Sequence, residues 1–225
     1  GIDHAVLMLG AMSAGVPVVP VSVAYSLLSQ DHAKLHHIVQ NVQPGLVYAS
    51  SATVFAQAFA ALASHGLPTI TAADLPALLA TAPGSALERA FAGLGPDTVA
   101  KILFTSGSTG LPKGVINTQR MLCSNQAMQN HCWPFLKRER LVLLDWLPWN
   151  HTFGGNHHFN FVITQGGTLN IDGGKPAPGL IEQTVANLRE ISPTVYFNVP
   201  AGYSMLLPYL ERDAALRDTF FRSLK

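Results

Sequence analysis

The chain has 225 residues, of which 48% are hydrophobic and only 12% are charged, so it can bury a sizeable core. Its 14 basic and 13 acidic residues give a formal net charge of +1 without a long run of either sign, which argues against nucleic acid as a partner. Cys123 and Cys132 fit neither a disulfide framework nor a CxxC pair, so we expect reduced thiols in a cytoplasmic protein.

The stretch 5–25 has no charged residue over a length that could cross a lipid bilayer. Gly15, Pro17 and Pro20 interrupt it midway, so we predict a buried helix followed by a buried strand, and no membrane span. Asp3 is expected to be the N-cap of that helix. We expect no secretion signal, because no cationic leader precedes the helix.

Up to about residue 104, helical patterns alternate with short runs rich in β-branched residues. The predicted elements are helices at 4–14, 31–42, 52–64 and 74–81, and strands at 17–22, 45–49 and 67–71. Such alternation is typical of right-handed βαβ units that build a mainly parallel sheet. The strands are apolar on both sides, so we predict an α/β fold with helices on both faces of the sheet, a layered α/β/α arrangement.

The alternation continues after a linker rich in glycine and proline at 82–98. The predicted elements are strand 100–104, a loop at 105–114, helix 118–136, strand 141–146, a helix from Phe153, strand 168–172, helix 180–191, strand 194–197 and helix 201–211. This organisation predicts two successive α/β subdomains. The first, 1–138, ends with the loop and its following helix, and the second begins at 139–225.

The loop Thr105-Ser-Gly-Ser-Thr-Gly-Leu-Pro-Lys-Gly114 has the composition of an anion cradle. Its glycines let backbone N–H groups converge on phosphate oxygens, its hydroxyls can donate hydrogen bonds, and Lys113 can place a positive charge beside them. It is not a Walker A loop, because Lys113 precedes a glycine and follows Pro112, which disfavours a direct run into a helix. On composition alone, a loop that only connects two elements remains an alternative.

A second group of polar and aromatic side chains lies at 145–158, directly after a predicted strand. Open α/β sheets bind ligands in loops at the carboxyl ends of their strands. We therefore expect Trp149, His151 and Phe153 to form the wall of a site for a flat aromatic acid. Gly154, with the glycine after it, is expected to leave room for that acid.

Other titratable residues are assigned no functional role. His157 and His158 are adjacent and face different ways on a helix, so we predict no metal site. Asp145 and Asp172 stand at strand ends, where a carboxylate commonly caps a helix or is solvated. Lys101 is expected to be an edge or surface charge.

The loop at 105–114 closely resembles the signature loop of the adenylate-forming superfamily, which contains acyl- and aryl-CoA synthetases, peptide-synthetase adenylation domains and firefly-type luciferases. The resemblance implies that this loop grips the β- and γ-phosphates of ATP. The implied binding residues are Thr105, Ser106, Gly107, Ser108, Thr109, Gly110 and Lys113. The segment 147–154 resembles the aromatic motif of the same superfamily, which implies that His151 lies between the carboxylate substrate and the α-phosphate.

The segments 145–159, 166–178 and 197–203 resemble the feruloyl-CoA synthase branch. This implies activation of an aromatic carboxylate as an acyl-adenylate and its transfer to coenzyme A. Mg²⁺ would bridge the phosphates of ATP, and Lys113 would neutralise departing pyrophosphate. The alternatives are a ligase for a fatty acid or amino acid, and a non-catalytic nucleotide-binding module.

The resemblance covers the whole chain but only part of the family's architecture. It implies that the adenine-binding strand, a glutamate that holds Mg²⁺ and a small domain with a catalytic lysine lie outside these residues. We therefore expect the 225 residues alone to bind nucleotide weakly at best and to be inactive.

Overall fold

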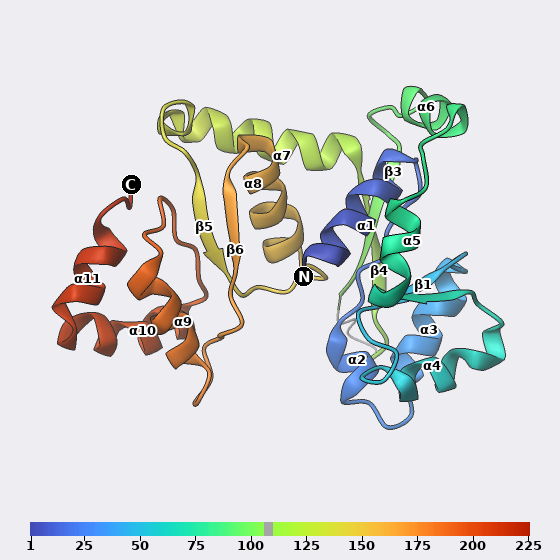
Figure 1. The fold of residues 1–225 in the computed structure, drawn as a ribbon, viewed down its shortest axis with the longest axis horizontal. Coiled ribbons are helices and arrows are strands. Elements are labelled where there is room, and N and C mark those ends of the chain that lie inside the picture. Colours follow the sequence, from blue (N-terminus) through green and yellow to red (C-terminus); the bar gives the residue numbers. More distant parts are fainter. Residues whose placement is uncertain (106–109) are drawn as a thin grey trace. The chain divides into compact units, whose positions relative to one another are not determined.

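The computed structural model describes residues 1–105 and 110–225. Its contacts divide the chain into two compact units, Gly1–Met121 (unit 1) and Leu122–Lys225 (unit 2). Helices alternate with short strands in both units, and this confirms the predicted α/β class (Figure 1). The subdomain boundary expected at residue 138 stays a prediction.

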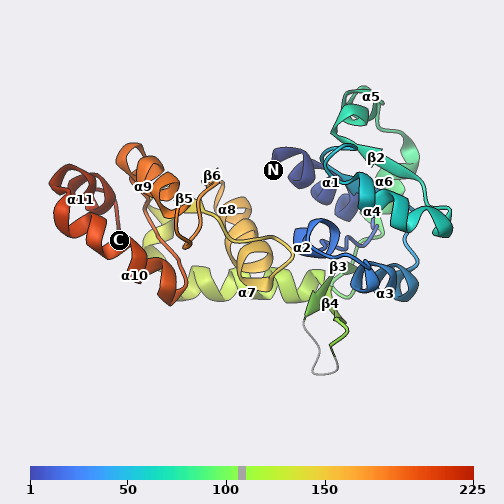
Figure 2. The same ribbon diagram turned by 90° about the horizontal axis from the view of Figure 1, so that it is seen from below.

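Unit 1 is built from short helices around short strands. Its helices are α1 (Ile2–Ser13), α2 (Val23–Leu27), α3 (Ala33–Val42), α4 (Ala56–Leu62), α5 (Leu75–Leu79) and α6 (Ser85–Ala92), with 3-10 turns at Ala63–His65 and Ala72–Asp74. Its strands are β1 (Val47–Ala49), β2 (Thr69–Thr71), β3 (Val99–Thr105) and β4 (Lys113–Thr118). β1 and β2 pair in parallel, whereas β3 and β4 are antiparallel and lie side by side (Figure 2).

The strand expected at 17–22 is only partly formed. Val18 donates its N–H to the Ala100 carbonyl at 3.0 Å and accepts from the Ile102 N–H at 2.9 Å, which makes an isolated parallel bridge to β3. The ladder cannot extend from Val18, because Pro20 lacks an N–H and the Val16 N–H donates to the Ala11 carbonyl at 2.9 Å. The chain therefore runs beside β3 without becoming a regular strand.

The chain leaves the loop at 105–114 as the strand β4, which was not predicted between the loop and the following helix. β4 pairs with β3 from Thr105 opposite Lys113 to Ile102 opposite Ile116, continuing towards Val99 after an irregularity. Its β-branched residues suit a strand, although Val115 and Ile116 are about half exposed. The predicted helix becomes α7 (Gln119–Cys132), and a separate 3-10 turn follows at Pro134–Lys137.

Unit 2 contains most of α7 and a parallel strand pair. Its further elements are β5 (Val142–Asp145), the π-helix η4 (Phe153–His158), α8 (Phe159–Gln165), β6 (Thr168–Ile171), α9 (Ile181–Glu190), α10 (Pro200–Arg212) and α11 (Ala214–Phe221). β5 and β6 run parallel, in register from Val142 opposite Thr168 to Asp145 opposite Ile171.

Helices cover both faces of the β5–β6 pair. Leu143 belongs to a buried cluster with Phe161 and Val162 of α8. The next residue of β5, Leu144, belongs to a different cluster with Val185 and Leu188 of α9. Because successive side chains of a strand point to opposite faces, the two clusters lie on opposite sides of the pair. Unit 2 therefore has the predicted α/β/α layering.

The segment 194–197, expected to be a strand, is hydrogen-bonded to β5 through its first residue and otherwise packs through its side chains. Thr194 donates its N–H to the Val142 carbonyl at 3.0 Å, and its hydroxyl oxygen accepts from the Val142 N–H at 2.7 Å. The helix α11 was not predicted. Asp213 caps it by accepting from the Leu216 N–H at 3.0 Å, as Asp commonly does at an N-cap.

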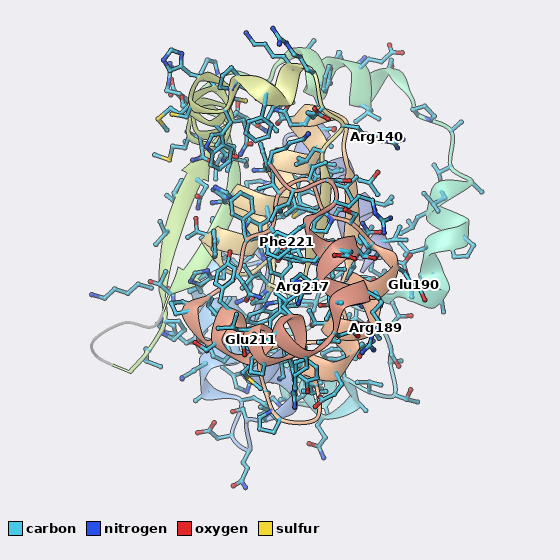
Figure 3. All side chains as sticks on the ribbon, turned by 90° about the vertical axis from the view of Figure 1, so that its left-hand side faces the viewer. Arg140, Arg189, Glu190, Glu211, Arg217 and Phe221 are labelled. Atoms are coloured by element: carbon cyan, nitrogen blue, oxygen red, sulfur yellow. The ribbon has the colours of Figure 1, made fainter. Side chains whose placement is uncertain are left out.

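The last three helices present charged side chains to solvent. Figure 3 shows Arg189 and Glu190 on α9, Glu211 on α10 and Arg217 on α11, all of which are exposed. Leu188 of α9 is fully buried in the core between them and the strands. This division into a polar and an apolar face is typical of helices that cover a sheet.

Three local features bear on the earlier expectations. Cys123 and Cys132 are free and exposed. Asp3 is not the N-cap of α1, because that position belongs to Gly1, but its carboxylate lies in the first turn, where it still favours the helix dipole. None of the helices in the described part of the chain is long and apolar enough to cross a membrane.

Candidate functional site

The β3–β4 hairpin places two predicted phosphate ligands opposite each other. Thr105 ends β3 and pairs with Lys113, which begins β4, and both are exposed. Gly110 has a φ of +85°, a left-handed conformation that glycine adopts without strain. Ser106, Gly107, Ser108 and Thr109, the other predicted ligands, lie outside the described residues.

The ammonium group of Lys113 is available for a ligand. Among the described residues, no carboxylate lies within ion-pair distance of it. Next to it, Gly114 lets β4 lie close to β3, since a Cβ there would be 3.1 Å from Ile102 Cγ2 and 3.2 Å from Phe104 Cζ. The mouth of the loop thus combines the hydroxyl of Thr105, a glycine with positive φ at 110 and the exposed ammonium of Lys113. This combination suits the binding of a phosphate group.

Lys101 is not the surface charge that the sequence suggested. It is 0% exposed, and β3 is not an edge strand, since β4 pairs with it on one side and Val18 bridges it on the other. Burial lowers the pKa of its ammonium to about 8. Nearby, the pKa of His4 falls to about 4, mainly through burial and then through the positive charges of the N-terminus and Lys101.

The second predicted site begins at the carboxyl end of β5. The chain turns sharply there, with the His151 N–H donating to the Pro148 carbonyl at 3.1 Å and the Gly155 N–H donating to the His151 carbonyl at 2.8 Å. His151 is exposed, and its Nδ1 accepts from the Phe153 N–H at 3.2 Å. The imidazole is thereby oriented at the surface of unit 2 with Nε2 left for a ligand.

The two glycines of this motif allow the backbone to pack closely on the side where a Cβ would point, and the room expected there for an acid stays a prediction. A Cβ on Gly154 would lie 2.7 Å from the Pro148 carbonyl oxygen, and one on Gly155 would be closer still to the carbonyl of Trp149. The backbone of 147–149 occupies the position that a Cβ on either glycine would need. They allow η4 to pack directly against the loop that carries His151.

Aromatic rings surround the predicted substrate residues. Trp149 packs on Phe159 with ring centroids 4.7 Å apart, and Phe153 packs on His158 at 4.4 Å. Phe197, from a segment far along the chain, stacks on His158 at 4.8 Å. Unit 2 therefore brings Trp149 and Phe153 into aromatic clusters, but much of their ring surface contacts protein.

A buried pair of Asp145 and His158 was missed by sequence reasoning. His158 Nδ1 lies 3.0 Å from Asp145 Oδ1, and both side chains are shielded from solvent. The same Asp145 oxygen accepts from the Leu147 N–H at 3.1 Å. The signal for this pair was a carboxylate at the end of an otherwise apolar strand, since a buried charge requires a partner.

The rings of His157 and His158 both pack against Phe197. Burial, followed by the neighbouring His158, lowers the pKa of His157 to about 4. Within residues 1–105 and 110–225, no three His, Cys, Asp or Glu side chains are grouped to hold a metal ion.

Asp172 is buried rather than solvated, and it is a structural centre. Its oxygens accept from the Gly174 N–H at 2.8 Å, the Thr184 hydroxyl at 2.6 Å and the Asn187 amide at 2.8 Å. It thereby ties the turn after β6 to α9.

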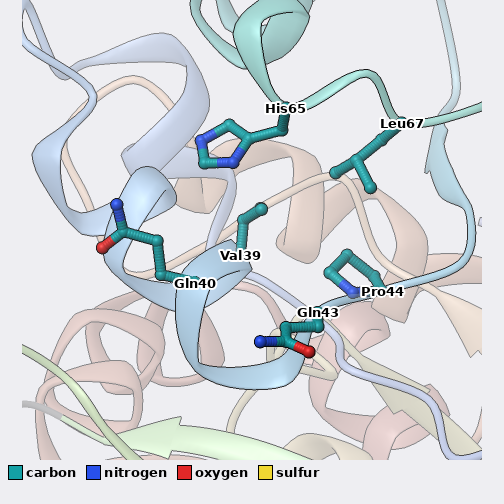
Figure 4. A pocket seen from close by; sticks show the side chains of 6 residues that line it. All are labelled: Val39, Gln40, Gln43, Pro44, His65 and Leu67. Atoms are coloured by element: carbon teal, nitrogen blue, oxygen red, sulfur yellow. The ribbon is translucent and has the colours of Figure 1, made fainter.

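A hollow of about 330 Å³ lies at the end of α3 (Figure 4). It is lined by Val39, Gln40, Gln43, Pro44, His65 and Leu67. None of the described residues predicted to bind ATP or the acid lines this hollow, so it carries no part of the candidate site.

A family model described as AMP-binding enzyme matches residues 1–225. The chain belongs to the AMP-binding enzyme family. This confirms the resemblance to adenylate-forming ligases that the loop at 105–114 suggested.

Among similar proteins, one named as a fatty-acid–CoA ligase in Mycobacterium leprae is 32% identical over 171 residues, which are 68% of this chain and 26% of that protein. The mitochondrial malonate–CoA ligase of Mus musculus is 31% identical over 116 residues, 52% of this chain and 19% of that protein.

Solved structures of this AMP-binding chain's relatives share its fold. A malonyl-CoA ligase with methylmalonyl-CoA and AMP bound superimposes with a TM-score of 0.74 at 23% identity, over 97% of this chain and 42% of that one. ATP-bound MatB from Rhodopseudomonas palustris gives 0.65 at 25% identity, over 92% and 39%. The chain thus spans well under two thirds of these relatives.

Proposed function

We propose that the protein containing this AMP-binding chain is an ATP-dependent, AMP-forming acid–thiol ligase. One observation carries the proposal. In a chain matched from end to end by the AMP-binding family, Thr105 and Lys113 face each other at the mouth of the predicted phosphate loop, and Lys113 has no carboxylate within ion-pair distance among the described residues.

The proposed binding of ATP uses the loop and its flanking strands. The triphosphate would be held by Thr105, Ser106, Gly107, Ser108, Thr109, Gly110 and Lys113. Lys113 would neutralise the pyrophosphate as it leaves, because a positive charge beside developing negative charge lowers the barrier. Mg²⁺ would bridge the phosphate oxygens of ATP.

The proposed acid site lies around His151. Its imidazole would contact the carboxylate and the α-phosphate, while Trp149, Phe153 and Gly154 would form the acyl side. We propose an aromatic acid such as a hydroxycinnamate, on the resemblance of 145–159 to feruloyl-CoA synthase and on the aromatic rings of this motif. Coenzyme A is the proposed thiol acceptor and the cytoplasm the proposed location.

The relatives support the ligase chemistry without selecting an aromatic acid. Their names refer to malonate and to fatty acids, and VinN, a further structure of the same fold, was solved with L-aspartate. A ligase for one of these acids is therefore the second candidate.

Exchange of labelled pyrophosphate into ATP by the complete protein tests the proposal. The panel would contain hydroxycinnamates, benzoates, fatty acids, malonate and aspartate. We expect acid-dependent exchange that is strongest with a hydroxycinnamate. A preference for malonate, aspartate or a fatty acid would contradict the aromatic substrate but leave the ligase proposal standing.

A non-catalytic nucleotide-binding module is the competing function. Such a protein would show heat on calorimetric titration with ATP but no exchange with any acid. The 225-residue chain by itself is expected to show no turnover, since the ligases that it resembles are much longer.

A further inference from the structure

A hydrogen bond joins α3 to the exit of the predicted phosphate loop. The ring Nε2 of His37 lies 2.9 Å from the carbonyl oxygen of Pro112, a residue distant in the chain but within the same unit. A carbonyl only accepts hydrogen bonds, so His37 must carry a proton on Nε2 and donate it.

Pro112 is placed where its orientation affects Lys113. The side chain of Pro112 is buried, and the Pro112 carbonyl belongs to the peptide group from which Lys113 starts. Because a peptide group is planar, a bond to that carbonyl also fixes the direction of the following N–Cα bond. Lys113 then continues into β4 opposite Thr105.

The helix α3, which carries His37, is held in place by its own packing. Leu35 and Val39 of this helix are buried in a cluster with Ala58 and Leu62 of α4. Asn41 donates to the His37 carbonyl at 2.7 Å, one turn further along the helix. The backbone that carries His37 is therefore fixed by packing that does not involve the loop.

We propose that His37 is a positioning residue for ATP: its bond to the Pro112 carbonyl holds Lys113 at the mouth of the phosphate loop. The inference rests on the proposed function, because it concerns the same loop. His37 does not touch ATP, and it acts through the backbone at 112–113.

The test compares three variants of the complete protein. His37→Ala removes the donor, whereas His37→Gln can still donate through its side-chain amide. His36→Ala is the matched control, because His36 is adjacent on the same helix and its ring contacts His65 instead of the loop. Pyrophosphate exchange gives kcat and KM for ATP and for the acid, and thermal unfolding gives stability.

We expect His37→Ala to lower kcat/KM for ATP by about 3- to 10-fold, the loss that one neutral hydrogen bond supports, with KM for the acid unchanged. His37→Gln should recover most of this loss. His36→Ala should leave kcat/KM for ATP at the wild-type value, whatever it does to stability. Equal ATP kinetics in His37→Ala and His36→Ala, or no recovery in His37→Gln, would overturn the proposal.

If the wild-type protein showed no pyrophosphate exchange, the proposed function would be contradicted. Hydrogen exchange of the backbone amides then tests the role of His37 separately. In His37→Ala, the amides from Lys113 to Ile116 should exchange faster than in wild type and in His36→Ala. Unchanged exchange there would show that His37 does not hold this part of the hairpin.

Discussion

Two lysines of one hairpin differ in exposure, and this difference decides which of them can bind an anion. Lys101 and Lys113 both belong to the β3–β4 pair, yet Lys101 is 0% exposed and Lys113 is exposed. The pKa of Lys101 is lowered to about 8 by burial. Only Lys113 is placed to bind an anion from solvent, which supports its assignment to ATP.

The first prediction concerns Lys113. In the complete protein, Lys113→Ala should weaken ATP binding about tenfold or more, because a charge-assisted contact to the phosphates is lost. Calorimetric titration with ATP measures the change. Lys137→Ala, at another exposed lysine, is the control and should bind as the wild type does. Equal affinity in both variants would remove Lys113 from the site.

The second prediction concerns Lys101. Its folded-state pKa of about 8 lies below the ordinary value of 10.5, so the unfolded state binds more protons between these values. The free energy of unfolding should therefore rise as pH increases from 8 to 10. Lys101→Met cannot titrate, so this rise should be absent in the variant. Urea unfolding at pH 7 and 9.5 measures the difference, and a wild-type profile in the variant would contradict the assignment.

At the scale of the element, the π-helix η4 is the unusual feature of unit 2. π-helical turns are rare in proteins as a whole, but many of those that occur lie at functional sites. Here η4 directly follows the loop that carries His151, and Gly154 lets it approach the Pro148 carbonyl. The Asp145–His158 pair joins its last turn to the end of β5. The position and orientation of the loop thus depend on the two glycines of this helix and on the buried contact between Asp145 and His158.

The third prediction tests this packing. Gly154→Ala should destabilise the protein by about 2 kcal/mol or more, because the added Cβ meets the backbone at 2.7 Å and neither group can move freely. The control is Gly10→Ala in α1, where a Cβ meets nothing within 4 Å and helix propensity favours alanine. Thermal unfolding compares the two. A Gly154→Ala protein as stable as Gly10→Ala would show that η4 shifts easily.

Element prediction succeeded where one local pattern dominates. The amphipathic repeat at 180–191 corresponds to α9, and the apolar run at 141–146 corresponds to β5. Prediction failed at β4, because its short sequence carries no clear strand pattern of its own. β4 becomes a strand through its pairing with β3. Prediction failed again at 17–22, where Pro20 cannot donate to the ladder with β3 that local hydrophobicity favours.

At the scale of the whole molecule, each unit contains a histidine that burial keeps neutral. The pKa of His4 in unit 1 and of His157 in unit 2 is lowered to about 4 in each case. Since the folded pKa lies below the ordinary 6.5, the unfolded state binds more protons between pH 6.5 and 4. Stability from these groups is present above pH 6.5 and is lost as pH falls towards 4.

The fourth prediction follows from this linkage. The thermal midpoint of the protein should fall as pH decreases from 7 to 5. His157→Phe keeps an aromatic ring beside Phe197 but cannot titrate, so its midpoint should fall less over the same range. His131→Phe, at an exposed histidine of α7, is the control and should keep the wild-type dependence. Identical pH profiles in all three proteins would contradict the buried, neutral state of His157.

The sequence by itself determined the α/β class and the position of the loop at 105–114 that we propose for phosphate binding, because alternating hydrophobic periods and a glycine–hydroxyl–lysine composition are local patterns. Tertiary structure alone decided which charges are buried, that β4 pairs with β3, and that His37 reaches Pro112. These features join segments far apart in the chain, and their free energy depends on desolvation and on partners that no local pattern specifies.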